Sequence, residues 1–222
     1  TEMKNKFVLP DLETAVDLQA YLQRAKRLDP DGMVRLRAFG PVLAAYVAPI
    51  WSGDLMASGP TVLGLRTCEL ASDGEVDSIV PIAAVLDRLA MLTAPGFSGA
   101  FEVTLPAAER APWAGIAPPR QGWYLNGTIN EAVLTQTAKD GIEEVKNTIP
   151  TAVGGPIAAR IRGEIWGRSM THGSNVPTGA AFVAAGLGFL TENEEVEEYI
   201  ADGWVRLSAS HGHVLSKVAR TL

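Results

Sequence analysis

The strongest constraint on the fold lies near the C-terminus, where the dipeptide Asp202-Gly203 separates two segments of alternating polarity. Asp-Gly favours a two-residue hairpin turn, because such a turn needs positive φ angles at its central positions. The flanking segments, at about 195–201 and 204–209, repeat with the period of two that is typical of half-buried strands. A third strand is predicted at about 213–218. These residues therefore predict an antiparallel three-stranded meander.

The last two of these strands must be joined by a reversal next to His211. We expect His211 to lie in the turn and Gly212 to supply the positive φ that such turns often need. His211 and His213 could instead share a metal with a third ligand such as His172 or Glu195, but no zinc-type spacing accompanies them. We therefore predict no metal site and no cofactor.

Helical and strand periodicities alternate in the N-terminal half. One predicted helix begins after Asp11 and ends before Pro30, and another covers about 82–91. Gly40-Pro41 is predicted to turn the chain between the first two strands. The predicted strands cover residues 33–39, 42–51, 61–70 and 99–105.

Three helices are predicted between residues 128 and 190. Thr128 to Glu131 form a capping-box pattern at the start of the first. Gly154-Gly155-Pro156 introduces the second, with the apolar face of that helix expected to include Ile157. The third helix is predicted from about Pro177 to Leu190. Its apolar stretch of 15 residues is shorter than the roughly 20 residues that cross a bilayer.

The predicted fold class is therefore α+β, with an N-terminal mixed α/β layer of antiparallel strands, a three-helix segment and the C-terminal meander. Four prolines and two glycines within residues 106–122 indicate a boundary. The predicted organisation is an N-terminal α/β subdomain at 1–110, a connector at 111–126, and three helices plus the meander at 127–222. One continuous fold is the alternative. The segments VRLRAFGPVLAAYVA (34–48) and VRLSASHGHVLSKVA (205–219) are similar in sequence. This similarity slightly favours a single sheet that contains both the N-terminal strands and the meander, but whether the meander joins that sheet stays open.

Composition narrows the classes of function. The chain has 19 Lys and Arg against 25 Asp and Glu, a net charge of −6, so it lacks the basic surplus that phosphate backbones attract. Three helices followed by a hairpin also resemble a winged helix-turn-helix, in which the third helix would contact DNA through polar and basic side chains. Here that helix contains GAAFVAAGLGF, which has no charged residue, so we expect no nucleic-acid partner. Cys68 stands alone, which excludes an internal disulfide and favours a reducing compartment. With no apolar signal segment at the N-terminus, we expect a cytoplasmic protein without a membrane partner.

No complete catalytic or cofactor motif is present, and we expect a non-catalytic protein. Arg120 could clamp an anion or stack on Trp123, in a Pro/Gly-rich segment of the kind that often carries binding residues. The competing interpretation is a linker that Trp123 pins to the core. His172 and His211 complete the set of candidate ligand-binding residues. Cys68 could act as a nucleophile, although a small core residue is the commoner role.

The acidic run from Glu192 to Glu198 does not match a calcium-binding loop. It is interpreted as a charged edge strand, whose charges discourage aggregation between strands.

Four segments together resemble a group of conserved actinobacterial proteins of unknown function. They are LDPDGMVRLRAFG, PPRQGW, NVPTGAAFVAAGLGFL and GWVRLSASHGHVL. The resemblance covers most of the chain. It implies a cytoplasmic bacterial protein and carries no information about chemistry.

Two functions from different classes remain. The favoured one is a non-catalytic protein that acts through protein contacts, as a homo-oligomer such as a homodimer. The alternative is an enzyme or small-molecule-binding protein whose site is assembled from Arg120, Trp123, His172 and His211. A deep pocket lined by these residues would favour the alternative, and a broad apolar surface patch would favour the first.

Overall fold

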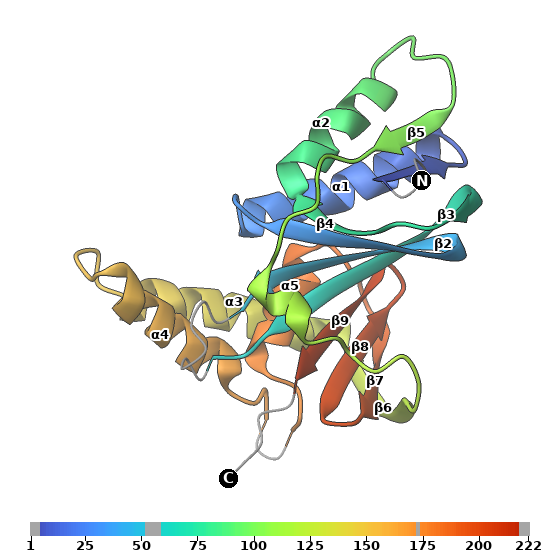
Figure 1. Cartoon of the computed structure of the whole chain (residues 1–222). Helices are drawn as coiled ribbons and strands as arrows, with labels where there is room; N and C mark the ends of the chain where they lie inside the picture. The colour runs from blue at the N-terminus through green and yellow to red at the C-terminus, as the bar shows by residue number, and fades with distance from the viewer. Residues whose placement is uncertain (1–4, 52–58, 172–173, 218–222) are drawn as a thin grey trace. The chain divides into compact units, whose positions relative to one another are not determined.

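The structure is a computed structural model that describes residues 5–51, 59–171 and 174–217 (Figure 1). Within these ranges the chain forms helices and antiparallel strands, which confirms the predicted α+β class. In this described part of the chain, no helix combines the length and the apolar character needed to span a bilayer.

The chain divides into two compact units. Unit 1 consists of Thr1–Pro49 and Leu65–Gly115, and unit 2 consists of Ile50–Gly64 and Ile116–Leu222. Each unit is therefore built from two separate stretches of sequence.

Within its described residues, unit 1 contains two helices, three complete strands and the greater part of β2 and β3. In chain order they are β1 (Lys6–Leu9), α1 (Leu12–Leu28), β2 (Met33–Ile50), β3 (Val62–Gly74), β4 (Asp77–Pro81), α2 (Ile82–Leu92) and β5 (Phe101–Thr104). A short 3₁₀ helix follows at Pro112–Gly115. β2 lies between β4 and β3, while β1 and β5 form a separate antiparallel pair. The helices α1 and α2 lie side by side over these strands (Figure 1).

Helix α1 is the helix that the sequence predicts. The Asp11 carboxylate accepts hydrogen bonds at 2.8 Å from both the backbone N–H and the hydroxyl of Thr14, which caps the first turn and lowers the pKa of Asp11. The helix ends at Leu28, before Pro30, because the residue preceding a proline avoids helical angles. Its buried face includes Leu18, Tyr21 and Leu22.

The strands around Gly40 differ from the prediction. Instead of two strands, the extended conformation continues through Gly40-Pro41 as the single element β2. Gly40 still adopts the positive φ, 57°, that a turn residue would need, and residues 39–42 are exposed. The sequence analysis also missed β4, which pairs with the first part of β2 from Met33↔Pro81 to Arg37↔Asp77.

Unit 2 contains three helices and four strands within its described residues. In chain order they are β6 (Tyr124–Asn130), α3 (Glu131–Thr148), α4 (Gly155–Gly167), α5 (Thr178–Gly186), β7 (Glu195–Ala201), β8 (Trp204–Ala209) and β9 (Gly212–Lys217). The strands are ordered β9-β8-β7-β6, and the predicted meander β7–β9 is confirmed. Strand β6 was not predicted, and its pairing with β7 changes two expectations.

The first expectation concerns the start of α3. Thr128 does not cap the helix, because it is paired with Glu197 inside the sheet. Asn130 is the N-cap instead, and its side chain accepts a hydrogen bond of 2.9 Å from the N–H of Ala132. The capping-box prediction placed the helix start two residues too early.

The second expectation concerns the acidic run. Because β6 pairs with β7, the glutamates of β7 are on an inner strand, and the predicted charged edge strand is wrong. Glu195 and Glu197 are exposed on one face of the sheet. Glu198 is buried on the other face, where its carboxylate accepts a hydrogen bond of 2.7 Å from Asn126.

The two turns of the meander follow different physical rules. Asp202 and Gly203 have φ angles of 41° and 78°, which confirms the two-residue hairpin turn. Ser210 and His211 form the second turn, so the predicted position of His211 is confirmed. Gly212 does not have a positive φ. A Cβ at Gly212 would come within 2.4 Å of the Phe189 ring, so glycine is required there by close packing.

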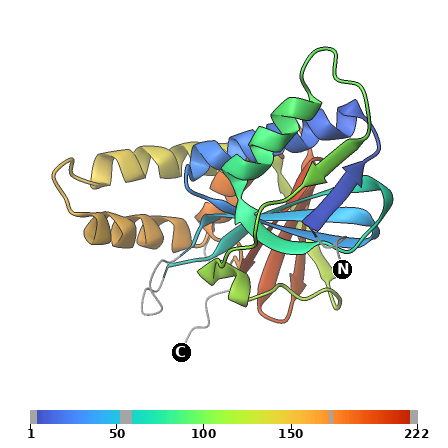
Figure 2. The ribbon, with the colours of Figure 1, turned by 45° about the horizontal axis from the view of Figure 1, so that its top comes forward.

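Helices α3 and α4 form an antiparallel helical hairpin (Figures 1 and 2). Their predicted apolar faces are only partly buried. Leu134 and Ile165 are in the core, whereas Ile142 and Ile157 have exposed fractions of 49% and 54%. Helix α5 ends at Gly186, earlier than predicted, and Gly188 turns away with a φ of 74°.

Candidate functional site

A cluster of interacting polar and aromatic side chains in unit 2 lies on one face of the sheet β9-β8-β7-β6. Residues that are directly opposite in adjacent strands project to the same face. One cross-strand row therefore runs Leu125–Tyr199–Arg206–Leu215, and the next runs Thr128–Glu197–Ser208–His213. We call this surface the meander face. It is buried at Leu215 on β9 and open at Leu125 on β6, where 57% of the residue is exposed.

Arg206 is the centre of the meander face. Its guanidinium carbon lies 4.8 Å from the ring centroid of Trp123 and 4.5 Å from that of Tyr199. Stacking of this kind is favourable because the aromatic ring faces carry negative charge density. Partial burial lowers the pKa of Arg206, the charged form of which is stabilised by Tyr199 and Glu197.

Both aromatic rings are held in place by hydrogen bonds. The indole N–H of Trp123 donates to the carbonyl oxygen of Pro119 at 2.9 Å. The hydroxyl of Tyr199 donates to the Glu197 carboxylate, and this bond raises the pKa of Tyr199. Trp123 thus anchors the segment before β6, while Tyr199 is ordered from within β7.

Ser208 connects Arg206 to His213. The Nε–H of Arg206 donates to the Ser208 hydroxyl oxygen at 3.0 Å, and Nδ1 of His213 lies 2.9 Å from the same oxygen. Burial lowers the pKa of His213, and the nearby Arg206 charge lowers it further. His213 is therefore held in its neutral form at physiological pH.

The arrangement is suited to recognition. It offers a stacked cation, two aromatic rings, a carboxylate and a neutral imidazole on a half-exposed surface. The thiol of Cys68 belongs to unit 1, and burial raises its pKa to about 11, which keeps it protonated at neutral pH. No group of three His, Cys, Asp or Glu side chains that could hold a metal occurs among the described residues.

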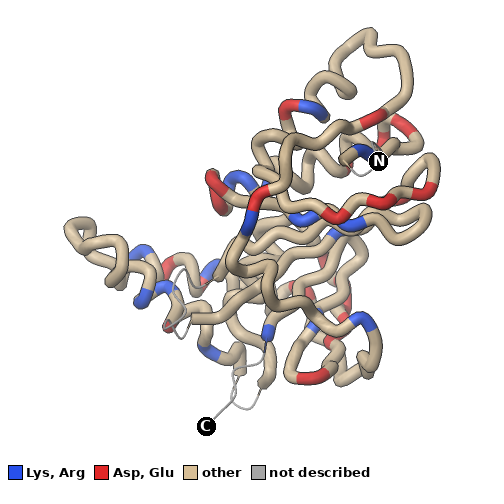
Figure 3. The backbone as a smooth tube through the Cα atoms, in the orientation of Figure 1, with Lys and Arg blue, Asp and Glu red and all other residues tan. Residues whose placement is uncertain are grey.

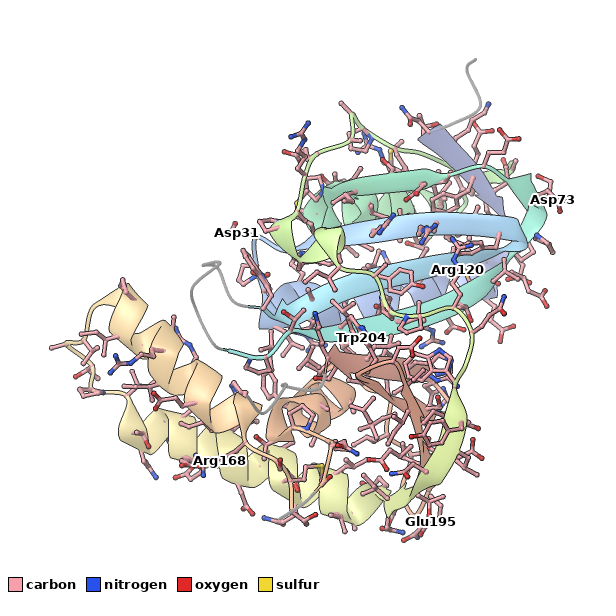
Figure 4. All side chains as sticks on the ribbon, turned by 60° about the horizontal axis from the view of Figure 1, so that its bottom comes forward. Asp31, Asp73, Arg120, Arg168, Glu195 and Trp204 are labelled. Atoms are coloured by element: carbon pink, nitrogen blue, oxygen red, sulfur yellow. The ribbon has the colours of Figure 1, made fainter. Side chains whose placement is uncertain are left out.

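The four residues singled out from the sequence have different surroundings. Trp123 is part of the cluster around Arg206. Arg120 is exposed in the bend before β6 (Figure 4). His211 is exposed in the β8–β9 turn, and His172 lies outside the described residues.

The structure does not bring Trp123 and His211 together. The strand register places Ala201 opposite Trp204 at one end of the meander and Glu195 opposite Asn130 at the other. In Figure 4 the labelled Trp204 and Glu195 mark these two ends. Trp123 precedes β6 at the Trp204 end, whereas His211 is in the turn at the Glu195 end.

The sequence analysis missed Tyr199, Arg206 and Ser208, although the sequence contains the signal that locates them. A two-residue turn at Asp202-Gly203 fixes which residues of the flanking strands are opposite each other. That register pairs Tyr199 with Arg206 and Glu197 with Ser208, as the structure has it. The contribution of Trp123 depended on β6, which was not predicted.

No curated protein matches this sequence. Among solved structures, the chain is similar to the crystal structure of the DNA polymerase III subunit beta from Pseudomonas aeruginosa, with 12% identity and a TM-score of 0.48. That match covers 98% of this chain, which spans 65% of the length of the solved chain.

Two family models cover almost the whole sequence. Residues 118–221 match the model described as Domain of unknown function (DUF8185). Residues 3–114, half of the chain, match the model described as Domain of unknown function (DUF8010). The expected resemblance to a family of unknown function is confirmed: the protein belongs to the family described as Domain of unknown function (DUF8010).

Proposed function

We propose that this protein acts through protein contacts, and that the meander face binds a second copy of the chain. The observation that carries the proposal is the Arg206 guanidinium held between Trp123 and Tyr199 on a half-exposed surface. A cytoplasmic setting is part of the proposal and is supported by the single cysteine in 222 residues.

Residue types support the choice of a protein partner. Trp, Tyr and Arg are enriched among the residues that contribute most to protein interfaces. The aromatic rings bury a large area with few rotatable bonds, and Arg adds a planar fork of hydrogen-bond donors. All three are pre-ordered here by contacts within unit 2, which reduces the entropy lost on association. Leu125 adds an exposed apolar side chain directly opposite Tyr199.

The distribution of charge favours a second copy over an unlike partner. Glu195 and Glu197 are exposed on β7, whereas Arg206 and Lys217 lie on β8 and β9. A two-fold axis brings each patch against the same patch turned around, so the carboxylates of one copy can meet the cations of the other. Basic and acidic residues are interspersed along the backbone of each unit (Figure 3), and the described residues form no basic stripe that would favour nucleic acid.

Sedimentation equilibrium tests this proposal. We expect the wild-type chain to dimerise within about 1 to 100 μM, the range of ordinary non-obligate contacts. Trp123→Ala and Leu125→Asp should each weaken dimerisation by about tenfold or more. Ile142→Asp on α3 is the matched control, since Ile142 is 49% exposed in the same unit but lies outside the meander face, and it should leave the equilibrium unchanged.

Two outcomes would contradict the proposal. A wild-type chain that stays monomeric over the whole range would exclude this mode of self-association. Equal weakening by Ile142→Asp and Leu125→Asp would place the interface elsewhere or indicate loss of folding, which circular dichroism of each variant distinguishes.

A further inference from the structure

Unit 1 contains a pocket between α1 and β3. It has a volume of about 210 Å³ and is lined by Thr14, Asp17 and Leu18 of α1 and by residues 66–69 of β3. Since a water molecule in the liquid occupies about 30 Å³, the pocket holds a ligand of roughly seven to ten non-hydrogen atoms. Leu18 and Cys68 supply apolar surface, and Arg66 supplies the positive charge.

Arg66 differs from another arginine of the same unit. The side chains of Arg66 and Arg35 both have an exposed fraction of 22%. Arg35 donates two hydrogen bonds to the Asp77 carboxylate, at 3.2 and 3.3 Å, and one to the carbonyl oxygen of Ala114 at 3.5 Å. Arg66 has an ion pair with Asp17 at 3.8 Å, beyond hydrogen-bonding distance, and donates no hydrogen bond to any of the described residues.

A guanidinium carries five N–H donors in a planar fork that matches the two oxygens of a carboxylate. The ion pair with Asp17 does not satisfy them, and because Asp17 is 56% exposed the pair contributes little. The fork of Arg66 at the pocket therefore lacks the planar, two-oxygen acceptor that Asp77 provides for Arg35. A carboxylate has this geometry.

We propose that this pocket binds a small monocarboxylate with a short apolar tail, through bidentate hydrogen bonds to Arg66. The tail occupies the space against Leu18 and Cys68. Asp17 and Glu69 line the same pocket, and their negative charges disfavour ligands with two or more charges, such as inorganic phosphate. This site lies in unit 1 and is independent of the dimer contact proposed for unit 2.

Cys68 provides a specific reporter of occupancy, because it lines the pocket and is the only cysteine in the chain. Burial raises the pKa of this thiol to about 11, so its alkylation is slow at neutral pH and is best followed at about pH 9. A ligand in the pocket covers the sulfur and slows the reaction.

The experiment compares the iodoacetamide alkylation rate of Cys68 in the presence of butyrate, butyramide or inorganic phosphate. Butyrate should slow the reaction at least threefold, whereas butyramide and phosphate should not. Protection should be lost in Arg66→Gln and retained in Arg35→Gln, the control matched in exposure. Asp17→Asn removes the competing carboxylate and should lower the butyrate concentration that gives half protection.

Each other outcome overturns the proposal. Equal protection by butyrate and butyramide would mean an apolar cavity without anion recognition. Protection that survives Arg66→Gln would place the anion elsewhere, and no protection at about 50 mM butyrate, a very weak affinity limit, would exclude the site. Arg66→Lys covers the case in which Arg66→Gln fails to fold, since it keeps the charge and should retain only part of the protection.

Discussion

The meander and the helical hairpin α3–α4 belong to the same unit, yet their sequences encode burial in different ways. In the meander, Asp202-Gly203 fixes the register, so alternation determines which side chains share a face. In α3 and α4 the apolar residues recur at helical spacing, but Ile142 and Ile157 are about half exposed. Helical spacing identifies an apolar stripe and leaves open which part of it is covered, because that depends on the neighbouring elements.

The largest effect is expected when one side chain is truncated in each region. Leu207 has an exposed fraction of 2% on the buried face of the meander, so Leu207→Ala should lower the unfolding free energy of the protein by about 2–5 kcal/mol. Ile142→Ala should change it by about 0.5 kcal/mol, as for other surface sites. Urea denaturation of both variants measures this, and similar losses would mean that the hairpin is as well packed as the meander.

Glycine packing gives the next largest contrast. Gly212→Ala places a methyl group within 2.4 Å of the Phe189 ring and should destabilise the protein by about 1–3 kcal/mol. Gly155→Ala, at the start of α4, meets open space and should be neutral within about 0.5 kcal/mol. If Phe189→Leu fails to restore part of the loss in Gly212→Ala, the close contact is not the cause.

The pH dependence of stability tests the interior of the meander face. The pKa of His213 is lowered in the folded state, so the unfolded chain binds the proton first as the pH falls through about 6.5. The unfolding free energy should therefore fall with decreasing pH below that value, and His213→Gln should remove this component. Denaturation midpoints between pH 8 and pH 5 measure it, with His211→Gln, a change at an exposed turn, as the control.

The smallest effect is expected at the β8–β9 turn. His211 is exposed between two strands and makes no hydrogen bond among the described residues, so His211→Ala should change the unfolding free energy by no more than about 0.5 kcal/mol. Thermal melts with and without a chelator measure this change. A large loss, or a chelator-sensitive melting temperature that the variant abolishes, would show that His211 is a metal ligand.

The sequence predicted correctly those elements whose ends are determined by neighbouring residues, and it missed elements that depend on distant ones. Helix α1 was predicted with both ends, because Asp11 and Pro30 act within one turn of the chain. Strand β6 was missed, because its sequence YLNGTIN shows no clear alternation and its pairing with β7 is interrupted by a bulge between Leu125 and Gly127. Its position is determined by pairing with β7, about 70 residues later, which no local pattern reveals.

The candidate sites also depend on contacts between distant segments, which the sequence did not reveal. Trp123 was recognised from its own neighbourhood, whereas its stacking on Arg206 requires β6, β7 and β8 to be adjacent. The pocket of Arg66 could not be predicted, because it depends on how α1 packs on β3. Gly212 was correctly placed next to the turn, but glycine is required there by the tertiary contact with Phe189 and not by a positive φ.

The division of unit 2 into two stretches also affects how the chain is made. Residues 50–64 belong to unit 2, and in α4 the backbone at Gly163 and Gly167 approaches Gly59 and Pro60 so closely that a Cβ would lie 3.4 and 3.3 Å from them. On the ribosome all of unit 1 has been synthesised once residue 115 is added, whereas residues 50–64 must wait for α4 and the meander. At about 5–20 residues per second, the 153 residues that follow Gly64 up to the end of β9 at Lys217 require roughly 8–30 s. During that time Gly59 and Pro60 are without the α4 backbone that they approach in the folded chain, so this part of unit 2 is completed late in synthesis.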